Sequence, residues 1–171
     1  MIGAQVCGET CVDVEWLLTD SRSLCFPEST LFFAIRTDRG DGHRYVRDLY
    51  ERGVRAFVVS DVQEGLTGAV QLLVQDTLTA LQRLAERHRE SYDIPVIGIT
   101  GSNGKTVVKE WLYQMLSPDM AVTRSPRSYN SQIGVPLSVW GLNDNTQIGI
   151  FEAGISRPGE MEALQRIIQP T

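Results

Sequence analysis

The stretch IPVIGITGSNGKT, residues 94–106, decides the fold of this chain. A short run rich in β-branched residues ends in glycines, and a Gly-Lys-Thr triplet opens an amphipathic helix that we expect from about Val107 to Leu116. A buried strand that feeds a glycine-rich loop and then a helix N-terminus is typical of a phosphate-binding loop. The alternative is a glycine-rich turn that carries a surface lysine.

The loop has the residue types that phosphate binding requires. Gly101 and Gly104 let the backbone approach an anion without a Cβ in the way, and the helix dipole directs N–H groups at phosphate oxygens. Lys105 would bring a positive charge to the β- and γ-phosphates, and the Thr106 hydroxyl would bind Mg²⁺. The general pattern has a glycine where Ile99 stands, so the spacing of this loop is a variant one.

The composition is that of an ordinary globular protein. Of 171 residues, 42% are hydrophobic and 22% are charged, which allows one large domain or two small ones with a buried core. A net charge of −5 without a basic cluster argues against a nucleic-acid partner. No apolar run is long enough to cross a bilayer and no secretory pattern opens the chain, so we expect a cytoplasmic location.

The cysteines and histidines predict no site of their own. Cys7, Cys11 and Cys25 form no Cys-x-x-Cys pair, and we interpret them as reduced, mostly packing residues rather than metal ligands. His43 and His88 fit structural positions on helices better than a role as proton carriers.

The fold class that we predict is α/β, with two domains. Residues 1–75 form a small α/β domain, and residues 76–171 form part of a mostly parallel, P-loop ATPase-like sheet domain with helices on both faces. The strands of the first domain are predicted at 12–18, 31–35, 56–59 and 70–74, with a helix over 43–52 that ends at Gly53. The second domain opens with a helix over 77–92 capped by Asp76-Thr77, and has strands at 94–99, 120–123 and 147–152, a loop at 124–129, a helix at 133–142 broken near Pro136, and a last helix from Pro158.

Polar residues follow the strands of the second domain. Ligands of such sheets gather beyond the carboxyl ends of the strands, so Glu152 could hold a metal ion alongside Thr106, or it could cap the next helix. Arg124 and Arg127 could contact a substrate phosphate or carboxylate, or form a solvated loop edge. Asn130 could face a substrate or cap the helix that follows it.

Several segments together resemble a known family. GSNGKT (101–106), preceded by IGIT, resembles the ATP loop of the Mur ligases, the ATP-dependent amide-forming enzymes of peptidoglycan synthesis. TDSRS (19–23), followed by LFFAI and DGH (41–43), resembles the module of that family that receives the UDP end of the substrate. YNSQIGVPL (129–137) and FEAGISRPGE (151–160) resemble two further segments, of which the second holds magnesium.

The resemblance implies a branch and a set of site residues. The last two segments are similar to the branch that adds D-alanyl-D-alanine to UDP-N-acetylmuramoyl-tripeptide, although Ser131 stands where that branch commonly has an asparagine. The resemblance implies that the phosphates of ATP are cradled by Gly101, Ser102, Asn103 and Gly104. It implies catalytic roles for Lys105 and Glu152, and Mg²⁺ binding by Thr106 and Glu152. The acceptor substrate would face Asn130 and Ser131, and its nucleotide end would be bound by Ser21 and Arg22.

The reaction of that family joins UDP-N-acetylmuramoyl-peptide to D-Ala-D-Ala through an acyl phosphate made from ATP. Because the central domain of the family continues well beyond the position of Thr171, we expect this chain to be an N-terminal fragment that does not complete ligation alone. The pairs Glu110-Trp111 and Val139-Trp140 are also similar to forms fused to an alanine racemase. Three alternatives stay open: another branch that adds a single amino acid, a nucleotide-binding module without ligase activity, and an interaction fragment whose sheet edge pairs with another copy.

Overall fold

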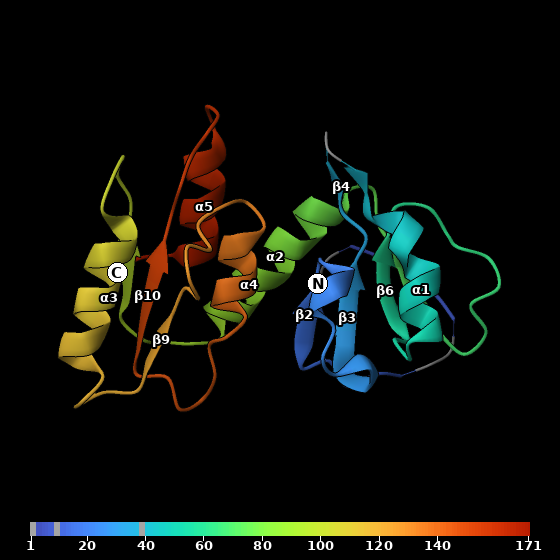
Figure 1. Ribbon diagram of the computed structural model, residues 1–171, viewed down its shortest axis with the longest axis horizontal. Helices are drawn as coiled ribbons and strands as arrows, with labels where there is room; N and C mark the ends of the chain where they lie inside the picture. Colours follow the sequence, from blue (N-terminus) through green and yellow to red (C-terminus); the bar gives the residue numbers. More distant parts are fainter. Residues whose placement is uncertain (1–2, 9–10, 38–39) are drawn as a thin grey trace. The chain divides into compact units, whose positions relative to one another are not determined.

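The protein consists of two compact units (Figure 1). The computed structural model describes residues 3–8, 11–37 and 40–171. The first unit ends at Leu81 and the second runs from Gln82 to Thr171, so the division lies inside helix α2 (Thr77–Glu90). The predicted boundary near residue 75 lies just before this helix. Asp76 accepts a hydrogen bond from the Thr79 N–H at 2.6 Å and caps the helix as predicted.

The first unit is built on a five-stranded sheet of order β1-β7-β6-β3-β2. All its pairings are parallel except β1 with β7. Every residue of β3 and β6 is buried, as expected of central parallel strands that are covered on both faces. The strands are β1 (Gln5–Cys7), β2 (Trp16–Leu18), β3 (Thr30–Phe33), β6 (Ala56–Val59) and β7 (Val70–Leu73).

Strand β2 is shorter than the sequence indicates. The alternation of residues 12–18 predicted a strand over its whole length, whereas only residues 16–18 are in one. Trp16 pairs with Thr30, the first residue of β3. The Glu15 N–H still donates to the Ser29 carbonyl at 2.9 Å, but Ser29 belongs to a short helix, η2 (Pro27–Ser29), and not to β3. The prediction was therefore wrong for residues 12–15.

Short helices complete the first unit. Helix α1 (Val46–Glu51) covers the sheet with Val46 and Leu49, both almost fully buried. Gly53 follows it with φ of 103°, and the Val54 N–H donates to the Leu49 carbonyl, so this glycine closes the helix as predicted. The remaining elements are η1 (Ser21–Ser23), η2 (Pro27–Ser29), η3 (Gly42–Tyr45) and the hairpin β4 (Arg36–Thr37) with β5 (Gly40–Asp41).

The second unit has a three-stranded, wholly parallel sheet of order β8-β10-β9. Helix α3 lies on one face, and α4 and α5 lie on the other with the second half of α2 (Figure 1). Phe151, Leu164 and Ile167 are central to the core on that second face. This arrangement confirms the predicted parallel sheet with helices on both faces. Its elements are β8 (Val96–Ile99), α3 (Lys105–Leu116), β9 (Val122–Arg124), α4 (Gly134–Val139), β10 (Ile148–Glu152) and α5 (Glu160–Ile168).

Pro136 does not break helix α4. The sequence predicted a break there, but Pro136 is the third residue of a helix that begins at Gly134. A proline costs nothing in the first turn of a helix because the N–H it lacks has no partner inside the helix there.

The last residues of the chain lie beside β8. The Thr171 N–H donates to the Val96 carbonyl at 3.1 Å, and the Val96 N–H donates to the Thr171 hydroxyl at 3.2 Å. These bonds place Thr171 at the side of β8 that faces away from β10.

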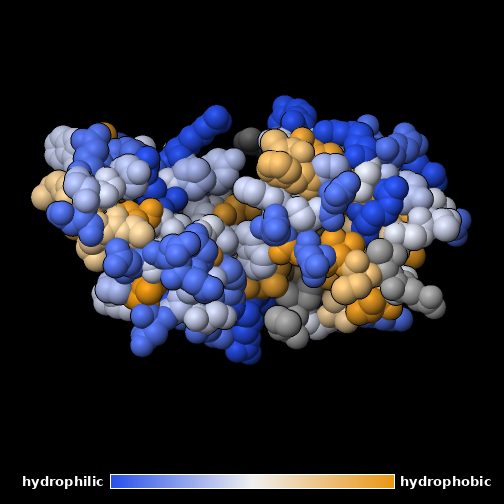
Figure 2. Space-filling model, turned by 90° about the horizontal axis from the view of Figure 1, so that it is seen from below, coloured by the Kyte–Doolittle hydropathy of each residue, from blue (hydrophilic) through white to orange (hydrophobic). Residues whose placement is uncertain are grey.

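The surface mixes polar and apolar side chains. Trp16, Phe26, Trp111 and Met115 are more than half exposed, and apolar patches lie between hydrophilic ones on the face drawn in Figure 2. Within the described ranges, no helix combines the length and the apolar character needed to cross a bilayer.

Candidate nucleotide and metal site

The glycine-rich loop joins β8 to α3. Gly101 and Gly104 have φ of 140° and 78°, a region that residues with a Cβ enter at a cost. Helix α3 begins at Lys105, two residues earlier than we predicted, and no side chain caps it. Its first N–H groups are therefore available to a ligand.

Lys105 lies across this loop. Its Nζ donates to the Gly101 carbonyl oxygen at 2.7 Å, and the side chain is only partly buried. Ser102 and Asn103, between the two glycines, are exposed. The loop therefore combines the backbone N–H groups at the start of α3 with one partly exposed ammonium, as a phosphate site requires.

Thr106 and Glu152 meet at the carboxyl end of the sheet. The Thr106 hydroxyl donates to Glu152 Oε2 at 3.1 Å, although 46 residues separate them in the chain. Glu152 is the last residue of β10 and is completely buried. It does not cap a neighbouring helix, which was the alternative.

These two oxygens suit a magnesium ion. Adjacent ligands of an octahedral Mg²⁺ with bonds of about 2.1 Å lie about 3.0 Å apart, and the hydroxyl and carboxylate oxygens of Thr106 and Glu152 lie 3.1 Å apart. A carboxylate and a hydroxyl are the hard oxygen donors that this ion prefers. The residues present fit the ion.

A buried lysine, which we did not predict from the sequence, lies beside this pair. Lys109 is completely buried, and its Nζ lies 2.9 Å from Glu152 Oε1 and 3.2 Å from Glu110 Oε1. Nζ also donates to the carbonyls of Ser125, at 2.9 Å, and Arg127. Residues three apart on a helix share a side, so the spacing from Thr106 to Lys109 was the signal that could have found it.

Arg124 and Arg127 have different surroundings. Arg124 is the last residue of β9 rather than part of a loop; it pairs with Glu110 and its guanidinium lies 3.7 Å from the Tyr113 ring centroid. The Arg127 side chain is exposed, and its backbone has φ of 51°. Of the two, only Arg127 keeps a side chain at the solvated edge.

Ser131, not Asn130, hydrogen-bonds the start of helix α4. The Gly134 N–H donates to Ser131 Oγ at 3.1 Å, and the Val135 N–H donates to the Ser131 carbonyl. Asn130 is instead tied to the strand that carries Glu152: its carbonyl accepts from the Gly154 N–H at 2.8 Å. Its side chain packs against Gly154, where an added Cβ would come within 3.0 Å of it. The structure thus places Asn130 beside Gly154, which follows the last residue of β10 by two positions.

The loop before α5 is organised by Glu160. Its carboxylate accepts from the N–H groups of Ser156, at 2.6 Å, and Arg157, at 2.9 Å. These backbone hydrogen bonds, with that of the Ser156 hydroxyl, lower the pKa of Glu160. The loop is held as a compact turn by an ionised side chain.

Ser21 and Arg22 lie at the carboxyl end of β2 in the first unit. Ser21 is buried, and its carbonyl accepts from the Arg52 guanidinium at 2.9 Å. Arg22 is largely exposed and makes a two-pronged contact with Asp20 at 2.9 and 2.7 Å. That hydrogen bonding lowers the pKa of the Asp20 carboxyl. Arg22 is therefore accessible to an anionic ligand, whereas Ser21 offers little surface.

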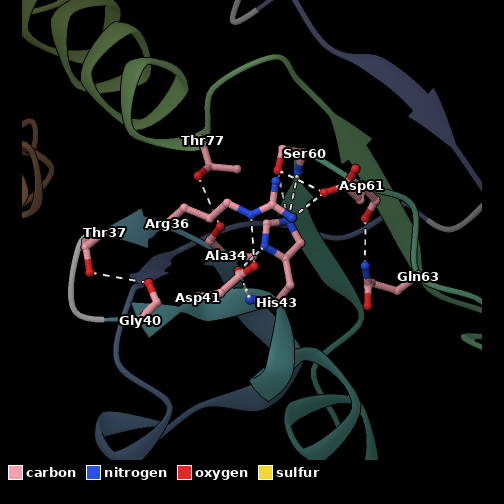
Figure 3. Close-up of polar contacts among 10 residues, drawn as sticks. All are labelled: Ala34, Arg36, Thr37, Gly40, Asp41, His43, Ser60, Asp61, Gln63 and Thr77. Atoms are coloured by element: carbon pink, nitrogen blue, oxygen red, sulfur yellow. Dashed lines mark hydrogen bonds and ion pairs between the residues drawn. The ribbon is translucent and has the colours of Figure 1, made fainter.

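His43 belongs to a polar network at the same end of the first sheet (Figure 3). Its Nδ1 lies 2.5 Å from Asp41 Oδ1, and Ser60 approaches Nε2 with both its N–H, at 3.0 Å, and its hydroxyl, at 3.3 Å. Because the backbone N–H of Ser60 donates to Nε2 and Asp41 lies at Nδ1, the ring is held at both nitrogens. These contacts suit the structural position that we expect for His43 better than the general base of a nucleophilic triad.

Arg36 extends this network to the surface, where it pairs with Asp41 at 2.8 Å and with Asp61 (Figure 3). Burial raises the pKa of the Asp41 carboxyl, but the hydrogen bonds from Arg36 and His43 outweigh it and hold that pKa well below its usual range.

The three cysteines are free and do not pack as we predicted. Cys11 and Cys25 are exposed, and Cys7 is half-buried. The part of the chain that the structure describes contains no cluster of His, Cys, Asp and Glu side chains that could hold a metal ion by themselves.

Comparison with known proteins finds a match within the second unit. The pattern of the Mur ligase middle domain matches residues 99–171, the segment that contains the glycine-rich loop, Asn130 and Glu152. This segment is similar to the middle domain of the Mur ligases.

Most of the chain is similar to one type of Mur ligase. The UDP-N-acetylmuramoyl-tripeptide–D-alanyl-D-alanine ligase of Bacillus subtilis is 36% identical over 92% of the chain, and that of Synechocystis is 37% identical over 91%. Among solved structures, MurF of Acinetobacter baumannii has a TM-score of 0.83 at 32% identity over 90% of the chain. MurF of Thermotoga maritima in complex with ADP has a TM-score of 0.78 at 28% identity over 91%.

The matched segment covers most of this chain but only a small part of each relative. The chain spans about a third of the length of the curated relatives, 34% in both bacterial proteins, and 33% and 35% of the two solved Mur ligase chains.

Proposed function

We propose that this chain carries the phosphate-loop half of the active site of a Mur ligase that joins D-alanyl-D-alanine to UDP-N-acetylmuramoyl-tripeptide. The observation that carries the proposal is the contact of Thr106, at the start of the helix after a glycine-rich loop, with the buried Glu152 at the end of the neighbouring strand, at 3.1 Å. The ligase activity for which the similar proteins are named, and the segments that resemble that branch, support the choice of substrate.

In the proposed reaction this chain holds the ATP phosphates. The N–H groups at the start of α3 bind phosphate oxygens. The Lys105 ammonium leaves the Gly101 carbonyl and contacts the γ-phosphate, whose negative charge it stabilises during transfer. Thr106 and Glu152 would hold Mg²⁺, which screens the charge between phosphates when it is bound. Positioning and charge neutralisation are the main contributions of a protein to such a step.

The remaining residues bind the acceptor. Asn130, held beside the end of β10, faces the acceptor substrate. Ser131 affects the binding of this substrate by holding the start of α4, where its hydroxyl accepts the Gly134 N–H. Arg22, which is exposed, interacts with the nucleotide end of the UDP-substrate, and Ser21 shapes the turn that presents it. Because its substrates are nucleotides, we place the protein in the cytoplasm. Because the chain spans about a third of the relatives' length, we expect no ligation from these 171 residues alone.

Isothermal titration calorimetry on the 171-residue chain tests the proposal. The ligands are Mg-ATP and UDP-N-acetylmuramoyl-tripeptide, and the variants are Lys105→Ala and Arg166→Ala, which removes a charge from an exposed position of α5. We expect Lys105→Ala to abolish ATP binding and leave uridine-nucleotide binding unchanged, and Arg166→Ala to change neither. A preference for GTP together with no uridine-nucleotide binding would show a nucleotide-binding module of another kind.

A further inference from the structure

We propose that Lys109 is a positioning residue, which holds Glu152 and the segment 125–130 in the arrangement that the metal ion and the acceptor substrate require. The sequence predicts no role for Lys109, and this residue takes no part in the steps above. The part of this inference that concerns the metal ion rests on the proposed function, whereas the part that concerns the segment 125–130 does not.

The contacts of Lys109 leave it no free donor. An ammonium has three N–H donors, and Nζ is surrounded by the carbonyls of Ser125 and Arg127 and by the carboxylates of Glu110 and Glu152. The side chain has no exposed surface. It therefore differs from Lys105, which is partly exposed and donates to one carbonyl of the loop. Lys109 is an internal counter-ion rather than a second phosphate ligand.

Lys109 determines which oxygen of Glu152 faces the loop. The ammonium occupies Oε1, at 2.9 Å, and the Thr106 hydroxyl contacts Oε2, at 3.1 Å. Oε1 is buried and has no hydrogen bond among the described residues, so the ion pair is its compensation. With Oε1 held in this way, only Oε2 is left for a cation bound at Thr106.

Lys109 also holds a strained turn. Arg127 has φ of 51°, a left-handed conformation that costs a residue other than glycine energy. Its carbonyl accepts a hydrogen bond from Lys109, as does that of Ser125. The Ser125 hydroxyl in turn accepts a hydrogen bond from the Glu152 N–H at 3.1 Å. The lysine, the turn and the metal-site carboxylate are thus one connected unit that ends three residues before Asn130.

Two measurements on the 171-residue chain test this inference. The first is the Mg²⁺ concentration that half-maximally strengthens ADP binding, measured by calorimetry. The second is the amide hydrogen exchange of residues 125–130, measured by mass spectrometry. The variants are Lys109→Met, which removes the charge, and Lys109→Arg, which keeps it. Circular dichroism checks that each is folded.

For Lys109→Met we expect the half-maximal Mg²⁺ concentration to rise about tenfold, the usual cost of losing an outer-shell partner of a metal ligand. ADP binding without Mg²⁺ should stay within about twofold of wild type, which a general loss of structure would not allow. Exchange at 125–130 should accelerate more than in the rest of the second unit, and Lys109→Arg should restore part of both effects.

Unchanged Mg²⁺ dependence in a folded Lys109→Met variant would overturn the proposal that Lys109 positions Glu152 for the metal ion. Unchanged hydrogen exchange at 125–130 would overturn the proposal that Lys109 holds this segment. If Lys109→Met does not fold, Lys109→Gln replaces it. It also removes the charge, so the Mg²⁺ dependence should shift in the same way, but its amide still donates to a carbonyl, so exchange at 125–130 should accelerate less than in Lys109→Met. If the wild-type chain binds no nucleotide at all, the proposed function fails, while hydrogen exchange still decides whether Lys109 holds the turn.

Discussion

At the scale of single residues, burial decides what each ionisable group contributes. Glu152 and Lys109 have no exposed surface and face one another. Each buried charge therefore needs the opposite charge of the other residue to offset the cost of its removal from water. Arg22 and Asp20 form a closer contact, at 2.7 Å, but both are largely solvated, and such a surface pair adds little to stability.

His88 makes the stability of the second unit depend on pH. Burial lowers the pKa of His88 below its ordinary 6.5, although hydrogen bonds to the carbonyls of Leu142, at 3.0 Å, and Trp140 oppose the shift. The unfolded chain therefore takes up a proton before the folded chain does. Stability is fully present above pH 6.5 and falls as the pH drops from there toward the lower, folded-state pKa.

Urea unfolding of wild type and His88→Gln at pH 7.5 and at pH 5.5 checks this expectation. Both pH values lie above the ordinary range of carboxyl groups, at about pH 4, so histidines dominate the difference. We expect wild type to lose more stability between the two than His88→Gln does. An equal loss in both proteins would contradict the assignment to His88.

At the scale of elements, one glycine fixes how η3 meets the sheet. A Cβ on Gly42 would lie 2.8 Å from the Ile35 N and 2.9 Å from the Ala34 carbonyl carbon. Both are backbone atoms that cannot turn aside. The DGH segment therefore needs glycine at its centre for a close approach of two backbones, and its neighbours Asp41 and His43 can then reach one another.

Replacing this glycine should separate the two backbones. We expect Gly42→Ala to reduce the free energy of unfolding of the first unit by about 1–3 kcal/mol, the usual cost of overpacking. The control is Gly40→Ala, where the new Cβ would meet only the end of the flexible Arg44 side chain, at 3.1 Å. Thermal unfolding of both variants measures the difference; similar midpoints would argue against the close contact.

The features that could be predicted from the sequence are those encoded by residues close together in the chain. The strand, the loop and the start of α3 are encoded by adjacent residues, so IPVIGITGSNGKT was sufficient for them. The proximity of Thr106 and Glu152 was predictable because both follow parallel strands of one sheet. The burial of Lys109 was not, since it depends on how closely α3 approaches the turn at Arg127. The short β1 and the Arg36 network likewise depend on partners far along the chain.

At the scale of the whole molecule, the two units have separate cores. The cluster around Phe32 and Phe57 shares no residue with the cluster around Phe151 and Leu164. Each sheet is also complete within its own unit, since no strand pairs across the division in the described ranges. The units should therefore respond separately to loss of a core side chain.

Truncating one core should leave the other protected. We expect Phe57→Ala to destabilise the first unit by about 3–5 kcal/mol, with faster hydrogen exchange in β3 and β6 and little change in β10. Phe151→Ala should produce the reverse pattern. Equal loss of protection in both units from either variant would show that they unfold together.

The position of Thr171 has a practical consequence for work with this chain. Its N–H and hydroxyl already bond to Val96, the first residue of β8, at 3.1 and 3.2 Å, so any residues fused after it start beside the edge of this strand. An affinity tag rich in β-branched residues can pair with such an edge as an additional strand. A flexible Gly-Ser spacer, or a tag on the other end of the chain, keeps binding measurements free of this interference.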